Sequence, residues 1–166
     1  ATQTLSAACV GRPAHAMMLS GPKGAGLGTL ASVVALGLSK DLAHSTAIAP
    51  EKGLIPIERI RQLYEQTKGI AKEAKIIVID DADAMSDDAQ NALLKLLEEP
   101  VDNVHFILTT HREQEMLPTI MSRAQHVEVL PISETQSTQL LEPFSLAPEK
   151  KSQLLFLAAG RPAELV

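Results

Sequence analysis

The chain has 166 residues, 45% of them hydrophobic and 2% aromatic, and carries a formal net charge of −5. This length suits one domain with a real core, or one domain and part of another, and no apolar run is long enough to cross a membrane, so we expect a soluble globular protein. The acidic balance and the lack of a basic cluster argue against a protein that grips DNA alone, because neutralisation of phosphates dominates such binding.

Apolar runs and segments of helical periodicity alternate along the first half of the chain. A buried strand is predicted over 16–21, followed by a glycine-rich loop and a helix over 29–42. The segment 43–52 is interpreted as a short linker, and an amphipathic helix is predicted over 55–74. The β-branched run 75–82 then predicts a strand that is covered on both faces.

The same alternation continues further along the chain. Ser86 is a suitable N-cap for a helix predicted over 87–99. A buried strand is predicted over 104–110, a short helical stretch near 114–124 and a final strand over 126–131. Strands that alternate with helices indicate an α/β fold, in which a parallel sheet carries helices on both faces.

From about Ser133 onward the pattern changes to helices only. We therefore expect an α/β domain over residues 1–132 and the start of a second, helical domain over 133–166.

The loop "GPKGAGLGT" resembles a phosphate-binding loop but departs from it at two positions. Gly21, Gly24 and Gly26 fit the pattern G-x-x-x-x-G-K-[ST], in which the lysine reaches the phosphates and the hydroxyl holds magnesium. Leu27 stands where the lysine belongs, and Gly28 stands where the hydroxyl belongs. The loop is therefore either a nucleotide site that has lost its chemistry or an accidental match to the motif.

Two nearby side chains are conceivable substitutes for the missing groups. Thr29 lies one place later than the required hydroxyl, and Lys23 lies earlier in the loop. Neither has the correct position in the motif, so we do not expect either to restore hydrolysis. The backbone amides and the helix N-terminus still attract anions, which leaves weak binding of ATP or ADP open.

Two acidic residues follow the predicted strand over 75–82. Asp80 and Asp81 lie at its carboxyl end, where open α/β sheets bind ligands. In P-loop proteins an aspartate here holds the metal, and the next acid orients the attacking water. Acids also end strands in ordinary solvated turns, but the upstream strand, glycine loop and helix favour the functional interpretation.

Several blocks of the sequence resemble, in order, bacterial DNA polymerase III clamp-loader subunits of the AAA+ class. "AQNALLKLLEEPVDNVHFILTT" and "LPTIMSRAQ" are similar to a helix ending in Leu-Leu-Lys-x-Leu-Glu-Glu-Pro, a strand ending in threonines, and a Ser-Arg-Cys motif. "GRPAHAMMLSGPKGAG" resembles the approach to the phosphate loop, and "IERIRQL" resembles a helix before the acidic strand. The resemblance covers 11–125 and implies the AAA+ form of the α/β fold, with a small helical lid domain after it.

Within this family the gamma/tau subunits are the ATPase motors, whereas delta-prime has a degenerate phosphate loop, and this chain resembles delta-prime. The resemblance implies a subunit that has no ATPase activity of its own and requires no cofactor. It implies a vestigial nucleotide site made of Gly21, Gly24, Gly26, Thr29, Asp80, Asp81 and Thr110.

The resemblance also assigns an arginine finger that acts in trans. Ser122 and Arg123 match the motif whose arginine reaches the ATP site of a neighbouring subunit, although Ala124 replaces the cysteine. A guanidinium suits this role because it stays charged and forks onto phosphate oxygens. We expect Ser122 and Arg123 to face outward from an anchored short helix.

Two further positions resemble sensors less specifically. Thr109 and Thr110 end a strand where the family places its first sensor, although threonine is common in strands. Arg161 in "AAGRPAEL" matches the second-sensor region only loosely.

The implied partners are a gamma/tau-like motor subunit, a delta-like subunit and, through the assembled complex, the sliding clamp and primer–template DNA. A single cysteine, Cys9, fits a reducing, cytoplasmic location, and the scattered histidines lack the spacing of a metal site. The cysteine-rich zinc module of many relatives is missing from 43–52.

Three functions compete on this evidence. The first is a non-catalytic clamp-loader subunit, and the second is an active AAA+ ATPase with an unorthodox loop. In the second, Asp81 would replace the usual glutamate. Aspartate is shorter than glutamate by one methylene, so its carboxylate would not reach the position that orients the attacking water. The third, a nucleotide-sensing module outside replication, is disfavoured by the density of clamp-loader blocks.

Overall fold

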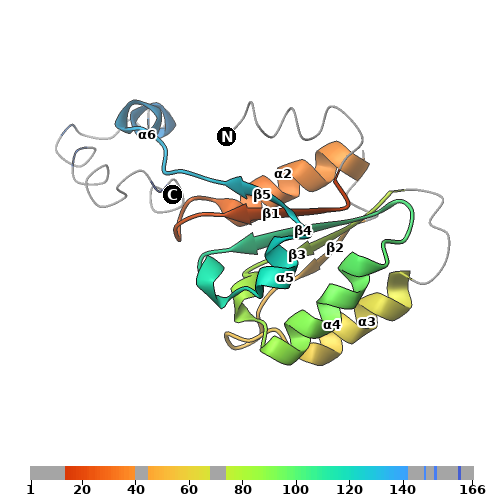
Figure 1. Ribbon diagram of the computed structural model, residues 1–166. Coiled ribbons are helices and arrows are strands. Elements are labelled where there is room, and N and C mark those ends of the chain that lie inside the picture. The colour runs from red at the N-terminus through yellow and green to blue at the C-terminus, as the bar shows by residue number, and fades with distance from the viewer. Residues whose placement is uncertain are drawn as a thin grey trace.

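The computed structural model describes residues 14–39, 45–67 and 74–141, together with the isolated positions 148, 152 and 161. In this part of the chain one sheet is covered by helices on both faces (Figure 1). The strands are β1 (Ala16–Ser20), β2 (Ser45–Ile48), β3 (Lys75–Ile79), β4 (Val104–Thr110) and β5 (Gln125–Glu128). The helices are α2 (Leu27–Ser39), α3 (Ile57–Thr67), α4 (Asp87–Glu98), α5 (Pro118–Met121) and α6 (Glu134–Leu141), with the short 3-10 turns η2 (Ala82–Ala84) and η3 (Glu113–Glu115).

All five strands run parallel, in the order β2-β3-β4-β1-β5. Met18 in β1 pairs with Leu108 in β4 on one side and with His126 in β5 on the other. Parallel neighbours need crossover connections, which the helices supply here. The predicted α/β fold, a parallel sheet with helices on both faces, is confirmed.

The interpretation of 43–52 as a linker is wrong over Ser45–Ile48, which forms the edge strand β2. This strand pairs only with β3, for example Ala47 with Val78. Ile48 is its one buried residue. An edge strand of 4 residues has no long apolar run, so periodicity in the sequence does not predict it. Its pairing with β3 becomes evident only in the folded sheet.

Neighbouring residues of β1 point to opposite faces of the sheet and join two separate hydrophobic clusters. Met17 and Leu19 pack beneath α2, whereas Met18 packs beneath α3 and α4. All 5 residues of β1 are buried. A strand that is covered on both faces has a continuous run of apolar residues, and this run is the reason that the sequence predicts β1.

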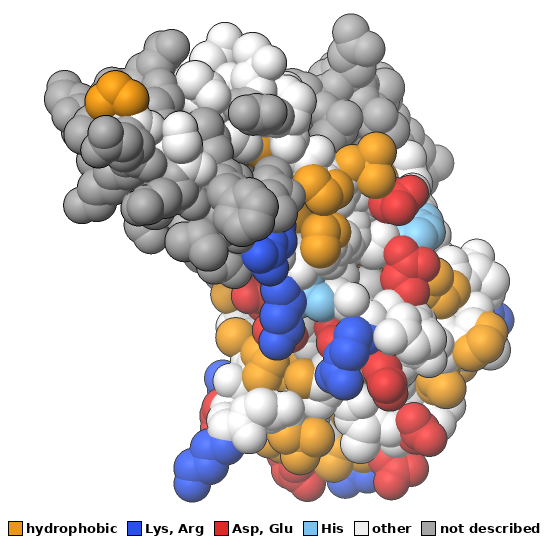
Figure 2. All heavy atoms as spheres, turned by 90° about the vertical axis from the view of Figure 1, so that its left-hand side faces the viewer, with side chains coloured by type: hydrophobic (Ala, Val, Ile, Leu, Met, Phe, Trp, Pro, Cys, Tyr) orange, Lys and Arg blue, Asp and Glu red, His pale blue; other side chains and the backbone are white. Residues whose placement is uncertain are grey.

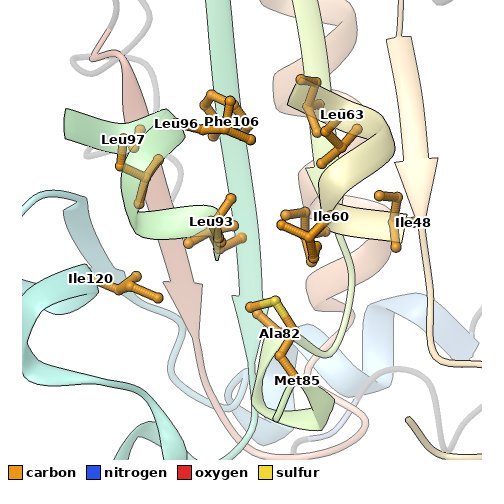
Figure 3. Packing of buried hydrophobic residues seen from close by; sticks show 14 of the residues in the cluster. Ile48, Ile60, Leu63, Ala82, Met85, Leu93, Leu96, Leu97, Phe106 and Ile120 are labelled. Atoms are coloured by element: carbon orange, nitrogen blue, oxygen red, sulfur yellow. The ribbon is translucent and has the colours of Figure 1, made fainter. Parts of the chain in front are cut away.

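The cluster beneath α3, α4 and α5 forms the main core (Figure 3). Ile60 and Leu63 come from α3, Leu93 and Leu96 come from α4, and Phe106 lies across from them on β4. Each such buried side chain contributes about 1.5–3 kcal/mol relative to an exposed one. This packing fixes α4, whose last residue, Glu98, forms an ion pair with Arg123.

The start of α4 agrees with its prediction, because the Ser86 hydroxyl accepts a hydrogen bond from the Ala89 backbone N–H at 3.3 Å. Other boundaries differ. β3 ends at Ile79, so Asp80 already lies in a turn, and β5 covers Gln125–Glu128 rather than 126–131. The predicted helical residues 40–42 and 68–73 lie outside the described residues.

The expected division into residues 1–132 and 133–166 stays a prediction. α6 is described after the sheet, and most of 142–166 lies outside the described residues. In the described part of the chain, no helix has the length and apolar character needed to span a membrane.

Candidate functional site

Three loops meet beyond the carboxyl ends of the central strands. They are 21–26 after β1, 80–81 after β3 and the segment that begins at His111 after β4. The Gly21 backbone N–H donates to the Thr110 carbonyl at 3.2 Å, which ties the first loop to β4. Figure 2 views this end of the sheet, where basic, acidic and hydrophobic side chains of the described residues are mixed. This is the edge at which open α/β sheets bind ligands.

The backbone of the glycine loop requires glycine at three positions. Gly24 has φ of 82° and Gly26 has φ of 80°, in the region that side chains rarely adopt. A Cβ on Gly21 would lie 2.5 Å from the Val129 carbonyl oxygen, too close for any side chain. The sequence thus keeps the glycines that this loop shape needs.

Leu27 occupies the lysine position of the motif but belongs to the core. Its side chain is only 2% exposed and packs with Leu19 and Val34 beneath α2. A P-loop lysine instead holds its ammonium group against the phosphates. Position 27 therefore contributes packing and supplies no cation.

Gly28 faces the first acidic residue but brings no ligand atom. A Cβ on Gly28 would lie 3.4 Å from both carboxylate oxygens of Asp80. Thr29 and Lys23 are both exposed, and within the described residues neither forms a hydrogen bond to Asp80. The structure thus brings Asp80 to the start of α2, as the motif requires, without the hydroxyl between them.

Thr109 fixes both acidic residues from the neighbouring strand. Its hydroxyl donates to Asp80 Oδ1 at 2.6 Å and accepts from the Asp81 backbone N–H at 2.9 Å. Thr110, which was predicted as part of the site, instead accepts from the Arg112 backbone N–H at 3.2 Å. Of the two threonines, Thr109 is the one whose hydroxyl contacts Asp80 and Asp81.

His111 joins the glycine loop to the second acid, and the sequence analysis missed it. Its Nδ1 lies 2.8 Å from the Gly21 carbonyl oxygen, and its Nε2 lies 3.3 Å from Asp81 Oδ1. A carbonyl oxygen only accepts, so Nδ1 donates in that contact. An imidazole therefore lies directly beside the acid that would orient water in a working ATPase. No sequence motif includes His111. The feature that could have drawn attention to it is its position directly after the two threonines at the carboxyl end of β4.

Asp83 and Arg112 form an ion pair at this edge. Arg112 Nε lies 2.9 Å from Asp83 Oδ2, and the His111 backbone N–H donates to Asp83 Oδ1 at 3.2 Å. Burial raises the pKa of the Asp83 carboxyl, but these hydrogen bonds outweigh it and bring that pKa below its ordinary value. The hydrogen bond to Asp83 raises the pKa of Arg112. The pair anchors the loop after β4.

Replacing Asp83 with asparagine should lower the free energy of unfolding by about 1–2 kcal/mol at pH 7, since it breaks hydrogen bonds to a charged group. The loss should shrink as the pH falls below the ordinary Asp pKa of 3.8. In that range the unfolded chain binds more protons than the folded one, so the wild type loses this stabilisation on acidification. Urea unfolding at pH 7 and at pH 3 measures both effects. A difference that is the same at both pH values, or one matched by the exposed control Asp102→Asn, would contradict the assignment.

The predicted arginine finger follows α5 directly and pairs with a residue of α4. Arg123 Nη2 is 2.8 Å from Glu98 Oε1 at the end of α4, and the side chains are 38% and 44% exposed, respectively. Arg123 Nη1 donates to the Thr119 carbonyl at 3.1 Å, and the Ser122 hydroxyl donates to the same carbonyl at 3.0 Å. Ser122 and Arg123 are both exposed, as expected, and the guanidinium end of Arg123 pairs with Glu98.

A groove of about 990 Å³ lies between α3 and α4, away from the glycine loop. Tyr64 and Arg61 line one wall, and Lys95 and Glu98 line the other. None of the lining residues belongs to the loops that carry the acids. The groove therefore does not contribute to the nucleotide-type site.

Sequence comparison connects these features to known proteins. The family model described as "DNA polymerase III, delta subunit" matches residues 37–133, more than half of the chain. The delta-prime subunit of DNA polymerase III from Escherichia coli is 32% identical over 120 residues, which cover 69% of this chain and 36% of that protein. The gamma subunit from Buchnera aphidicola is 30% identical over 155 residues, covering 80% of this chain and 43% of that protein. The chain spans less than half the length of these relatives.

Solved structures give the same fold. A DNA polymerase III gamma subunit-related protein from Thermotoga maritima superposes with a TM-score of 0.78 at 23% identity, covering 95% of this chain and 53% of that one. The Holliday junction branch migration motor RuvB from Thermotoga maritima superposes with a TM-score of 0.72 at 14% identity, covering 99% of this chain and 56% of that one. Identities this low bear on the fold alone, and they confirm the AAA+-like α/β fold.

Proposed function

Since this chain belongs to the DNA polymerase III delta subunit family, we propose that it is a non-catalytic subunit of a clamp loader. In this role it completes a ring of subunits and supplies Arg123 to the ATP site of a neighbour. The observation that carries the proposal is Leu27, which is 2% exposed in the core where an active loop needs a cation. A subunit with no cation for its own phosphates has no use for Arg123 within its own site.

The chemistry of Arg123 suits action on a neighbour. The guanidinium stays charged at every physiological pH and can bind two phosphate oxygens at once. Ile120, on the same short helix, is fully buried, which holds the residues around Arg123 against the domain. Such anchoring favours a side chain that must meet a reacting phosphate in one geometry.

Partners and ligands follow from the same proposal. A gamma/tau-like motor subunit would hold the ATP that Arg123 meets, and a delta-like subunit would share the ring. The sliding clamp and primer–template DNA would be engaged by the assembly. The chain would need no cofactor, and ATP or ADP would bind weakly at the glycine loop, where the amides of the loop and of α2 remain.

An active ATPase is the second candidate, and the arrangement of Asp80 favours it. Asp80 lies against the start of α2, where a P-loop aspartate holds its metal, and the Thr109 hydroxyl holds its Oδ1 by a hydrogen bond of 2.6 Å. Against this, the His111 ring lies beside Asp81, with Nε2 3.3 Å from Oδ1, and position 28 has no hydroxyl. Magnesium-dependent ATP turnover by the isolated chain, abolished by Asp80→Ala, would favour this candidate. We expect no turnover above background.

Arg123→Ala tests the proposed function directly. In a complex with the ATPase subunits, we expect this change to leave assembly intact and to lower DNA- and clamp-stimulated ATP hydrolysis. The rate of hydrolysis should fall only in part, by no more than the fraction of the total rate that comes from the one ATP site adjoining this subunit. Hydrolysis rates, with gel filtration to show that the variant is incorporated, measure both effects.

The matched control is Arg59→Ala. Arg59 is a surface arginine of similar exposure that also lies near a glutamate, with Nε 3.6 Å from Glu51 Oε1. It should leave the stimulated rate unchanged. If Arg123→Ala and Arg59→Ala give the same rate as the wild type in fully assembled complexes, the finger role is refuted.

A further inference from the structure

Arg123 is held by contacts that engage only part of its guanidinium. Nη2 pairs with Glu98 Oε1 at 2.8 Å, and Nη1 donates to the Thr119 carbonyl at 3.1 Å and lies 3.4 Å from the Ser122 hydroxyl. Arginine has five N–H donors, and Nε makes no hydrogen bond to the described residues. Donors therefore remain for an anion while the side chain is fixed.

Both partners of this ion pair lie on anchored elements. Glu98 ends α4, where Leu96 and Leu97 are buried in the main core. Gln90, buried in α4, donates to the Glu115 carbonyl at 2.8 Å and accepts from the Leu117 backbone N–H at 2.8 Å, which fixes the entry to α5. The packing of α4 against α5 thus brings the two charged side chains within reach of each other.

The ion pair adds little to the stability of the fold, because exposed pairs contribute only about 0.2–1 kcal/mol. Its effect is on conformation. A free arginine side chain samples many rotamers, and fixing one such side chain on binding weakens the interaction by about 2- to 10-fold. A carboxylate that already holds the guanidinium removes this cost before any partner arrives.

We propose that Glu98 is the positioning residue for Arg123, holding the guanidinium ready for a phosphate on a neighbouring subunit. This inference rests on the proposed function. Glu98 does not touch the nucleotide in this scheme, because its negative charge would repel phosphate. It acts through Arg123 alone, and the same carboxylate belongs to the wall of the groove between α3 and α4.

The test uses the complex with its ATPase subunits and the variant Glu98→Gln, which keeps the shape of the side chain and removes its charge. The Arg123-dependent part of the stimulated rate is the difference between the wild type and Arg123→Ala. We expect Glu98→Gln to lower this part about 2- to 10-fold in kcat, with KM for ATP nearly unchanged, because the finger acts in the transition state. Glu98→Asp keeps the charge and should recover part of the loss.

The matched control is Glu99→Gln, one residue further along, which is exposed and has no ion pair to the described residues. It should behave as the wild type. The double variant Glu98→Gln/Arg123→Ala should equal Arg123→Ala alone. In the isolated chain, the Arg123 Nε–H NMR signal should shift in Glu98→Gln and stay in place in Glu99→Gln.

Two results would overturn the inference in different ways. If Arg123→Ala lowers the rate but Glu98→Gln matches Glu99→Gln, the positioning role fails and the proposed function stands. If neither Arg123→Ala nor Glu98→Gln changes the rate in assembled complexes, the proposed function fails and the inference falls with it. Additive losses in the double variant would also refute it, because Glu98 would then act independently of Arg123.

Discussion

Replacing Leu27 with lysine should lower the free energy of unfolding by about 2–4 kcal/mol. The change removes a buried apolar side chain and places an ammonium group where water cannot solvate it. Leu27 is 2% exposed and packs within the cluster beneath α2. The lysine can avoid burial only by turning out toward the loop, which leaves a void behind it. We do not expect the variant to gain ATPase activity, since Gly28 still lacks a hydroxyl and the Asp81 carboxylate is still one methylene shorter than the usual glutamate. Chemical denaturation and a coupled ATPase assay measure the two outcomes.

Two controls separate the packing of Leu27 from the mere presence of a lysine. Leu27→Met keeps the volume and should cost less than about 1.5 kcal/mol. Thr29→Lys adds a cation at an exposed position of the same helix and should change stability by less than about 0.5 kcal/mol. If Leu27→Lys proves as stable as Thr29→Lys and binds ATP tightly, then position 27 is open to the loop and the degenerate-site interpretation is wrong.

Replacing Phe106 with alanine should be still more destabilising, by about 3–5 kcal/mol, because it leaves a large cavity at the middle of the sheet. Phe106 is 2% exposed on β4, the central strand, and packs within the main core. Its ring also meets the His15 ring edge-on, with centroids 5.4 Å apart. The midpoint of urea denaturation, followed by circular dichroism, measures the change.

Two further variants show whether this loss comes from the core. Phe106→Leu fills most of the space and should cost clearly less than the alanine variant. Leu130→Ala removes a side chain that is 65% exposed and should change stability by no more than about 0.5 kcal/mol. Equal losses for Phe106→Ala and Leu130→Ala would contradict the packing of β4 against α3 and α4.

The sequence by itself determined the features that depend on near neighbours along the chain. The strand predicted over 104–110 coincides with β4, because a strand buried on both faces is a continuous apolar run. Ser86 was identified as an N-cap because its hydroxyl bonds a residue 3 positions away. The lysine and hydroxyl missing from positions 27 and 28 can likewise be read from the loop motif itself.

Only the tertiary structure decided how distant side chains meet. His111 contacts Gly21 across 90 positions, and Thr109 contacts Asp80 across 29. Neither pairing has a local signal, because both depend on the order and register of parallel strands whose ends meet at one edge. The choice between Thr109 and Thr110 as partner of the acids depends on that register as well, since neighbouring residues of a strand point to opposite faces.

The same reason explains the ion pair at Arg123. The motif predicted the arginine, but its partner Glu98 is 25 positions away, at the end of a helix whose placement the core packing fixes. The edge strand β2 also needed the folded sheet, because its 4 residues carry one buried side chain and gain their structure from hydrogen bonds to β3. Periodicity encodes which face of an element is buried, whereas packing in three dimensions decides which polar groups meet beyond that face.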